Sequence, residues 1–451
     1  MASAPTLSDD RSFGVRLRAD LGALLRGPRE LWLLFALKFL ESVAHFAIYT
    51  LLAVYLSEDL HYGDQQAGVI AGTWLTAVSI VMFFSGFIAD VMGIRRAMLL
   101  AVSSVLVGRT MMALLHDPVL PLVGLGISTW GVASMIPTMT AGVRRYTTKD
   151  TVSFGFSLFY VIMNVGALVA PLMVGSLRAW LKTGLDLSLF GMTSHFSTSQ
   201  LVFSVAAAVT AVTGVLALGL TGEPAVDNDA PKKDNSFLRV LKDVAGERAF
   251  WGFMLFVSLL VLVRLIFQHA HLTWPKYTQR EIGKDFNFAF YWAINPAMII
   301  VLTPIVTALT RRLSAFWCIV AGSLITTSSV FFIASSSAIW AQIGFIVTLS
   351  LGETLWSPRL YEYTAVVAPP GREASYMGLS QIPMFVAKPI VGWMSGWMLS
   401  SWCPETGPRD AQFMWLVIGL TTLVGPLAIM GLKNVIETGK NSGRPSATPA
   451  A

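Results

Sequence analysis

The main pattern along the chain is a series of long apolar stretches separated by short polar segments. A helix needs about 20 apolar residues to cross the ~30 Å hydrocarbon core of a membrane. The sequence contains a run of stretches of about this length, and each predicts one transmembrane helix. The twelve predicted spans are 31–56, 66–89, 97–115, 119–143, 154–180, 199–221, 250–275, 287–310, 314–335, 338–368, 375–401 and 411–433.

The composition agrees with a membrane protein. Of the 451 residues, 54% are hydrophobic and only 13% are charged, whereas about 25% of residues are charged in a soluble protein. The first thirty residues are polar and rich in arginine, so we expect no cleavable signal peptide. The net charge of +6 lies in particular loops and does not indicate a nucleic-acid partner.

Basic residues are concentrated in alternate loops. Lys and Arg in short loops stay on the cytoplasmic side of a membrane. The N-terminal tail is basic, and so are the loops after the even-numbered spans, such as the one that contains Arg95 and Arg96. This predicts a protein of the plasma (inner) membrane with both termini in the cytoplasm. The exception is the loop after the seventh span, which contains Lys276, Arg280 and Lys284.

A long polar segment divides the spans into two sets of six. Its Pro, Asp, Asn and Lys content predicts a linker. The fold class is therefore an all-α polytopic membrane protein with two six-helix bundles. We expect a cytoplasmic tail at 1–30, bundles at 31–221 and 249–433, a cytoplasmic linker at 222–248 and a disordered cytoplasmic tail at 434–451.

The loop after the second span contains a recognisable motif, with Gly86, Asp90, Gly93, Arg95 and Arg96. Gly86 permits close helix approach, and Gly93 allows a tight turn. The segment resembles the GxxxDxxGxxR motif of the major facilitator superfamily, whose members also have six helices, a cytoplasmic linker and six more helices. The resemblance implies that Asp90, Arg95 and Arg96 form a charged gating latch that stabilises the outward-facing state.

Two further motifs resemble one family within that superfamily, the proton-dependent oligopeptide transporters. Span five contains Phe159-Tyr160-Val-Ile-Met-Asn164-Val-Gly166, which is similar to the FYxxxNxG core of that family. Span ten contains LGETLWSP at 351–358, which is similar to its LGExxxSP element. The resemblance implies that Tyr160 and Asn164 line the substrate cavity.

Other family positions are occupied as well. Asn295, before Pro296, fits the eighth span, and Glu41 stands where the family's ExxER motif has its last Glu. The resemblance implies that Glu353, the Glu of the span-ten element, lies in the central cavity and engages the substrate or an internal salt bridge. Trp356 shares the helix face of Glu353 and could line the same pocket, although packing is the alternative.

The chain departs from the peptide-transporting members at four positions. Ser42 and Tyr49 replace two arginines of span one, Ile136 replaces the lysine of span four, and Gln268 replaces the acid of span seven. In the family these residues help to hold the peptide termini and to take up the proton. We therefore expect Tyr49 and Gln268 to line a cavity whose substrate differs from an ordinary peptide.

Ionisable side chains inside the spans are the main candidates for function. Such a group costs at least ~2.5–3.5 kcal/mol at the bilayer centre, so it is expected to pair, to face water or to function. Glu41 and His45 share one face of span one with Lys38. Glu41 either pairs with Lys38 or carries a proton, and His45 either titrates or stays neutral. We predict that Glu41, His45 and Glu353 couple transport to protons.

Two cations are candidates for an anion site. Arg264 shares one face of span seven with Gln268, and Lys388 precedes Pro389 in span eleven. Arg264 either binds an anion or makes a structural pair. Lys388 either pairs with a glutamate or binds a substrate carboxylate. Cations outnumber carboxylates inside the spans, and because an unmatched buried cation is unfavourable, the sequence predicts a substrate with a negative group.

The sequence thus predicts a proton-coupled symporter of the oligopeptide transporter family, which moves a small peptide or a peptide-like, carboxylate-bearing solute by alternating access. The alternative is a proton-driven antiporter that exports a drug or metabolite. A receptor or a membrane-embedded enzyme is disfavoured, because charges are buried in both halves and no catalytic cluster is found. The expected partners are the solute, protons and the lipid bilayer. We expect a monomer, and no phosphate loop or metal-ligand cluster indicates a cofactor or metal.

Overall fold

The structure is a computed structural model in which residues 22, 26–85, 92–148, 151–189, 192–220, 246, 248–310, 312–367 and 382–436 are described. Six helical segments form the first bundle. They are α2 (Arg29–Val54), which continues into the π-helical turn η1 (Tyr55–Asp59), α3 (Asp64–Ser85), α5 (Ile94–Leu114), α6 (Leu120–Tyr146), α7 (Val152–Trp180) and α8 (Thr198–Leu218).

The second bundle begins at α10. Its helices are α10 (Arg248–Leu272), α11 (Trp274–Glu281), α12 (Phe288–Trp292), α13 (Ile294–Thr310), α14 (Ala315–Ser328), α15 (Val330–Ser335), α16 (Ile339–Val367), α18 (Ile382–Trp402) and α19 (Ala411–Gly431). Eleven helices among the described residues are long and apolar enough to cross a membrane. Because α18 lies at the remaining predicted span, 375–401, the prediction of a twelve-helix all-α fold is confirmed.

Two predicted spans are interrupted. The eighth is divided into α12 and α13 at Ala293, just before Pro296. A proline ring clashes with the carbonyl group four residues earlier, here that of Trp292, and this disrupts a continuous helix. The ninth is divided into α14 and α15 at Ser329, whose hydroxyl donates to the carbonyl oxygen of Thr326 at 2.6 Å. Side chains of this kind compete with backbone hydrogen bonds and bend helices.

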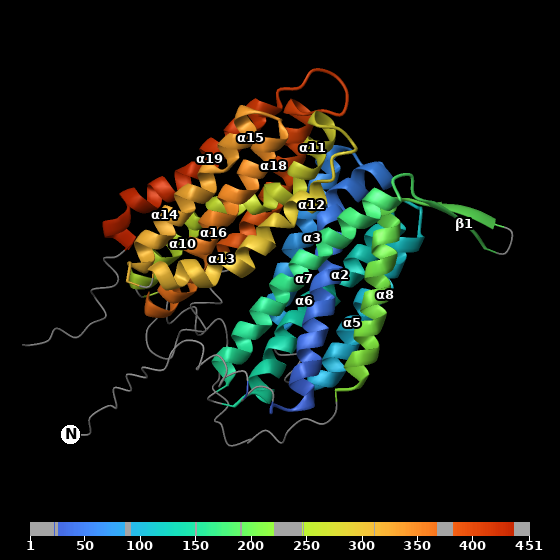
Figure 1. The fold of residues 1–451 in the computed structure, drawn as a ribbon, viewed down its shortest axis with the longest axis horizontal. Coiled ribbons are helices and arrows are strands. Elements are labelled where there is room, and N and C mark those ends of the chain that lie inside the picture. The colour runs from blue at the N-terminus through green and yellow to red at the C-terminus, as the bar shows by residue number, and fades with distance from the viewer. Residues whose placement is uncertain are drawn as a thin grey trace, which may run out of the picture.

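A short β-hairpin lies within 181–198, which the sequence identified only as a mixed, outward-facing loop. Strand β1 (Leu185–Leu189) pairs antiparallel with β2 (Met192–Phe196). The hairpin projects away from the first bundle (Figure 1). It leads directly into α8, whose start is fixed by a reciprocal capping box between Ser197 and Gln200.

The two bundles are inclined to one another (Figure 1). We call the end that carries η1, the β-hairpin and α11 the hairpin end, and the end where α2 and α10 begin the linker end. The bundles meet at the hairpin end and diverge towards the linker end. The predicted linker at 222–248 and the tails at 1–30 and 434–451 lie almost entirely outside the described residues.

Candidate functional site

Two pairs of glycines bring the bundles into backbone contact at the hairpin end. Gly68 and Gly72 lie one turn apart on α3, and Gly392 and Gly396 lie one turn apart on α18. A Cβ atom at Gly68 would lie 2.2 Å from the carbonyl oxygen of Gly392, and one at Gly396 would lie 2.4 Å from that of Asp64. Small residues four apart allow this close approach of helices. We call this contact the glycine seam.

A buried charge cluster closes the same end. Asp64 of α3 accepts from Lys276 Nζ at 2.6 Å and from the two terminal nitrogens of Arg280 at 2.7 and 2.8 Å. Lys276 and Arg280 belong to α11 of the other bundle, and all three side chains are almost fully buried. Burial lowers the pKa of Lys276, and the neighbouring Asp64 opposes this effect. We call this cluster the Asp64 latch.

The latch was missed as a site in the sequence, although a signal was present. Lys276 and Arg280 were noted only as exceptions to the distribution of basic loops. The structure gives a reason for the exception, since both cations are matched by an acid of the opposite bundle. Such a pair joins the bundles only while they touch at this end.

Deeper between the bundles, Tyr49 of α2 donates a 2.7 Å hydrogen bond to the side-chain oxygen of Gln268 of α10. The ring of His271 stacks on Tyr49, with centroids 4.2 Å apart. Tyr49 and Gln268 are two of the four positions at which the chain departs from the peptide transporters. The structure therefore brings the two substitutions together as a neutral contact across the bundles.

Aromatic rings surround this contact. Trp74 lies 6.4 Å from Tyr49 and 6.1 Å from His45, and Trp292 lies edge-on to His271 at 4.7 Å, all between ring centroids. His45, a predicted proton carrier, is thus placed among rings on the same side of α2. Neither tryptophan was singled out in the sequence, because a lone aromatic residue in an apolar span gives no signal of its own.

The second bundle holds its acid with amide and hydroxyl groups. Asn295 of α13 donates to Glu353 of α16 at 3.0 Å and to the Ser350 hydroxyl at 3.1 Å. Both Asn295 and Glu353 were predicted site residues, and the structure brings them into direct contact. Among the described residues Glu353 makes no ion pair with a cation, and it remains partly accessible.

One cation, Arg264, acts on this carboxylate, and a second, Lys388, lies near Arg264. The positive charge of Arg264 on α10 acts on both Glu353 and Lys388. Among the residues that the structure describes, Arg264 makes no hydrogen bond or ion pair. Lys388 of α18 donates to the hydroxyl of Ser79 on α3, which is a neutral partner in the opposite bundle. The region around Glu353 therefore has more positive than negative groups.

Glu41 has very different surroundings. Its two oxygens accept from the two terminal nitrogens of Arg109 at 2.9 and 2.8 Å, and Arg109 also donates to Thr210 at 2.5 Å. Glu41 is 5% exposed and Arg109 is 1% exposed. The possible pairing of Glu41 with Lys38 is not found, because Lys38 lies over the ring of Phe159 instead.

Three further predicted site residues lie on α16 and α7. Trp356 is 3% exposed and donates to Thr326 within its own bundle at 3.1 Å, so it belongs to the packing of that bundle. Asn164 donates to the backbone oxygen of Tyr160 one turn earlier on α7. Tyr160 is 42% exposed. A shared helical face correctly relates residues of one helix, but it does not show which face meets the other bundle.

The gating motif is described only in part. Arg95 and Arg96 are exposed in the first turn of α5, and Gly93 adopts a φ of 78°, which favours glycine and agrees with the expected turn. Asp90 lies outside the described residues, so the gating contact between Asp90 and the two arginines stays a prediction. Among the described residues, no group of three or more His, Cys, Asp and Glu side chains could hold a metal ion.

Comparison with known proteins places this geometry in context. The family model of the Major Facilitator Superfamily matches residues 34–392. The multidrug resistance protein MdtH of Yersinia pestis (strain Pestoides F) is 24% identical over 408 residues, which cover 89% of this chain and 95% of that protein.

Solved structures share the fold. A peptide transporter, POT, has a TM-score of 0.70 at 18% identity, with 91% of this chain and 96% of that chain covered. The nucleoside transporter NupG has a TM-score of 0.73 at 13% identity, with 90% and 100% covered. At these identities the likeness describes the architecture.

Proposed function

Because the chain belongs to the major facilitator superfamily of membrane transporters, we propose that it is a proton-coupled symporter for a small, carboxylate-bearing, peptide-like solute. The resemblance of its span-five and span-ten motifs to the oligopeptide transporters supports this assignment. We place the protein in the plasma membrane as a monomer, with the linker end in the cytoplasm. The glycine seam and the Asp64 latch then close the outer end, so this conformation faces inward.

The observation that carries the proposal is the excess of positive charge around Glu353. When Glu353 is ionised, its negative charge is available to Arg264. When Glu353 is protonated, Arg264 and Lys388 face no carboxylate in this group. A buried cation without a counter-charge is unfavourable, so a substrate carboxylate should bind most favourably after Glu353 has taken up a proton.

This dependence of solute binding on the protonation of Glu353 leads to symport. The empty carrier is stable with Glu353 ionised, and the loaded carrier is stable with both the proton and the anion bound. A carrier with only one of the two has an unbalanced charge near the midplane. If only balanced forms cross between the inward and outward states, the proton and the solute move together. Asn295 keeps Glu353 oriented in both forms, because its amide hydrogen-bonds to either a carboxylate or a carboxylic acid.

Alternating access follows from the contacts between the bundles. The Asp64 latch and the Tyr49–Gln268 bond both join the first bundle to the second. Opening the hairpin end requires both to break. The Asp64 latch would close the outer gate, and Arg95, Arg96 and Asp90 would act at the opposite, cytoplasmic end.

A second candidate function is drug export by proton antiport, and the curated relative supports it. MdtH is named a multidrug resistance protein and matches nearly the whole chain. A cationic solute would compete with the proton for Glu353 instead of requiring it, so the same carboxylate would exchange one for the other. Stacked aromatic rings beside Tyr49 would suit a flat organic cation.

The sign of the proton movement separates the two functions. Purified protein in liposomes with a trapped pH-sensitive dye is given either dipeptides and other small carboxylates or lipophilic cations such as ethidium. Acidification of the interior on addition of an anionic solute supports symport. If no anionic candidate moved protons inward while cations discharged a preset proton gradient, the symport proposal would be wrong and the antiport proposal would replace it.

A further inference from the structure

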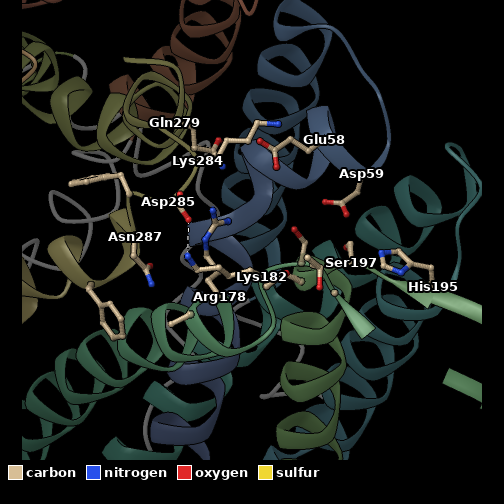
Figure 2. A pocket seen from close by; sticks show the side chains of 17 residues that line it. Glu58, Asp59, Arg178, Lys182, His195, Ser197, Gln279, Lys284, Asp285 and Asn287 are labelled. Atoms are coloured by element: carbon tan, nitrogen blue, oxygen red, sulfur yellow. Dashed lines mark hydrogen bonds and ion pairs between the residues drawn. The ribbon is translucent and has the colours of Figure 1, made fainter. Parts of the chain in front are cut away.

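A cavity of about 630 Å³ lies at the hairpin end, away from the region of Glu353. Figure 2 shows side chains of both bundles that point into it. The first bundle supplies the end of α2, the end of α7 and the start of α8, and the second supplies α11 and the loop before α12. None of the central site residues lines it. We call it the outer cavity.

One wall of the outer cavity is acidic. Glu58 and Asp59 belong to η1, the π-helical turn that ends α2. π-helical turns are rare and occur often at functional sites. The Ser197 and Ser199 hydroxyls lie beside Asp59, and Figure 2 shows Asp59 and Ser197 on the same side of the cavity. This wall is suited to an ammonium group.

The facing wall is basic. Arg178 near the end of α7 lies over the ring of Phe288 at 4.9 Å from its centroid. Among the described residues Arg178 makes no hydrogen bond or ion pair, and it does not pair with Glu58 or Asp59 either. Lys182, in contrast, is already occupied by Asp285 at 2.7 Å. Lys284 also lines the cavity and makes no hydrogen bond or ion pair among the described residues, but its charge acts on Glu58. Arg178 is therefore the cation that we assign to a carboxylate.

An unpaired acceptor also lies in the lining. The amide nitrogen of Asn287 donates to the backbone oxygen of Gly175 at 2.7 Å. Its side-chain oxygen is buried and has no hydrogen-bond partner. Buried polar atoms are nearly always hydrogen-bonded. This oxygen is closed off from the cavity in the present conformation, so an N–H or O–H group of an occupant would reach it after a rotation of the Asn287 side chain.

We propose that the outer cavity binds a small zwitterion, with its carboxylate at Arg178, its ammonium at Glu58 and Asp59, and a further N–H or O–H donor at Asn287. Because both bundles form the lining, the occupant holds the hairpin end closed. The site is separate from the central one and does not depend on the proposed function. A zwitterion on this side of the membrane would slow reopening and hence slow transport.

The test uses full-length protein in lipid nanodiscs and calorimetric titration with glycylglycine. This probe carries both charges and one amide N–H. The comparison probes are 5-aminopentanoate, which has the same length and lacks the amide, and pentanoate and butylamine, which carry one charge each. We expect glycylglycine to bind most tightly, 5-aminopentanoate less tightly, and the two singly charged probes at least about tenfold more weakly.

Variants locate the binding. Arg178→Gln should raise the Kd for glycylglycine about tenfold or more. Arg144→Gln removes an exposed arginine at the linker end and should not change it. If Arg178→Gln does not fold, Asp59→Asn on the opposite wall serves instead.

Three results would overturn the proposal. The first is an absence of binding, and the second is equal binding of the zwitterions and the singly charged probes. The third is binding that is lost in Glu353→Gln but kept in Arg178→Gln, which would place the probe in the central site. Failure of the outer site would leave the symport proposal intact, since that proposal is tested by proton movement.

Discussion

Glu41 and Glu353 are acids inside the spans of facing bundles, and their surroundings differ in kind. Glu41 has a two-pronged ion pair with Arg109, which is in turn held by Thr210, all within the first bundle. Glu353 is held by the neutral amide of Asn295. The charge of Arg264 acts on Glu353, but among the described residues the two make no ion pair.

This difference distinguishes an acid that stabilises the fold from an acid that can couple transport to protons. A buried carboxylate with a bidentate arginine loses both charged hydrogen bonds if it is protonated, so it resists a change of charge. A carboxylate held by an amide can take up a proton and keep its partner. We therefore assign the coupling proton to Glu353 and a stabilising role to Glu41, which revises the equal weight that the sequence gave them. The following predictions test this contrast, from the largest expected effect to the smallest.

The largest effect is expected at Glu41, the acid that is paired with Arg109. Glu41→Gln leaves Arg109 buried without a counter-charge, which should destabilise the protein by about 3–5 kcal/mol. Replacing the pair together, by Glu41→Met with Arg109→Leu, should recover most of this loss, since apolar replacements of buried pairs are often neutral. Thermal unfolding of the purified variants measures both. Normal stability of Glu41→Gln together with altered proton coupling would reverse the assignment.

The second prediction concerns the Asp64 latch. Asp64→Asn removes the carboxylate shared by Lys276 and Arg280, which should favour opening of the hairpin end by roughly 3 kcal/mol, or about 100-fold in the ratio of closed to open forms. Cys403 is a native reporter, because it is fully buried at this end and the backbone oxygen of the same residue accepts from Arg280. Thiol labelling of Cys403 should accelerate in the variant.

Controls make this labelling specific. Burial raises the pKa of Cys403 to about 11, so labelling of the closed form should be slow at neutral pH and should quicken as the pH rises towards that value. Cys318, buried within the second bundle, should label at an unchanged rate. Gly392→Ala should act like Asp64→Asn through the glycine seam, whereas Gly126→Ala, which has open space around it, should not. Equal labelling in all four proteins would contradict the gate.

The third prediction concerns the unpaired cation. Arg264→Gln should weaken solute binding by about 1.5–3 kcal/mol, which is roughly 10- to 100-fold, since charged hydrogen bonds have this strength. Folding should be unaffected, because Arg264 makes no hydrogen bond or ion pair with the rest of the described chain that would be lost. The KM for transport and the unfolding temperature are measured together. A large loss of stability with an unchanged KM would make Arg264 structural.

The smallest effect is expected at Tyr49. Tyr49→Phe removes only the hydrogen bond to Gln268, at about 0.5–1.5 kcal/mol, and keeps the stacking on His271. Labelling of Cys403 should rise by a few-fold. A change as large as that of Asp64→Asn would show that the neutral contact, and not the ionic latch, holds the bundles closed.

The helices were predictable because long apolar runs have one stable form in a membrane, as helices that satisfy their own backbone. The assignment of Asn295 and Glu353 to the candidate site followed from motif resemblance. The pairing of Glu41 with Arg109 did not, because the partners lie on helices 68 residues apart, and spacing along one helix relates only neighbours on that helix. For Trp356 the sequence left packing open as the alternative to a place in the pocket, since its helix has polar groups on more than one face.

The central claim is that Glu353 carries the coupling proton. The direct test compares Glu353→Gln with wild-type protein in liposomes, first for solute accumulation driven by an inward proton gradient, then for exchange of labelled against unlabelled solute without a gradient. We predict that the variant loses accumulation and keeps exchange, because the amide mimics the protonated acid and still leaves Arg264 to the solute. Accumulation at the wild-type level in Glu353→Gln would contradict the account.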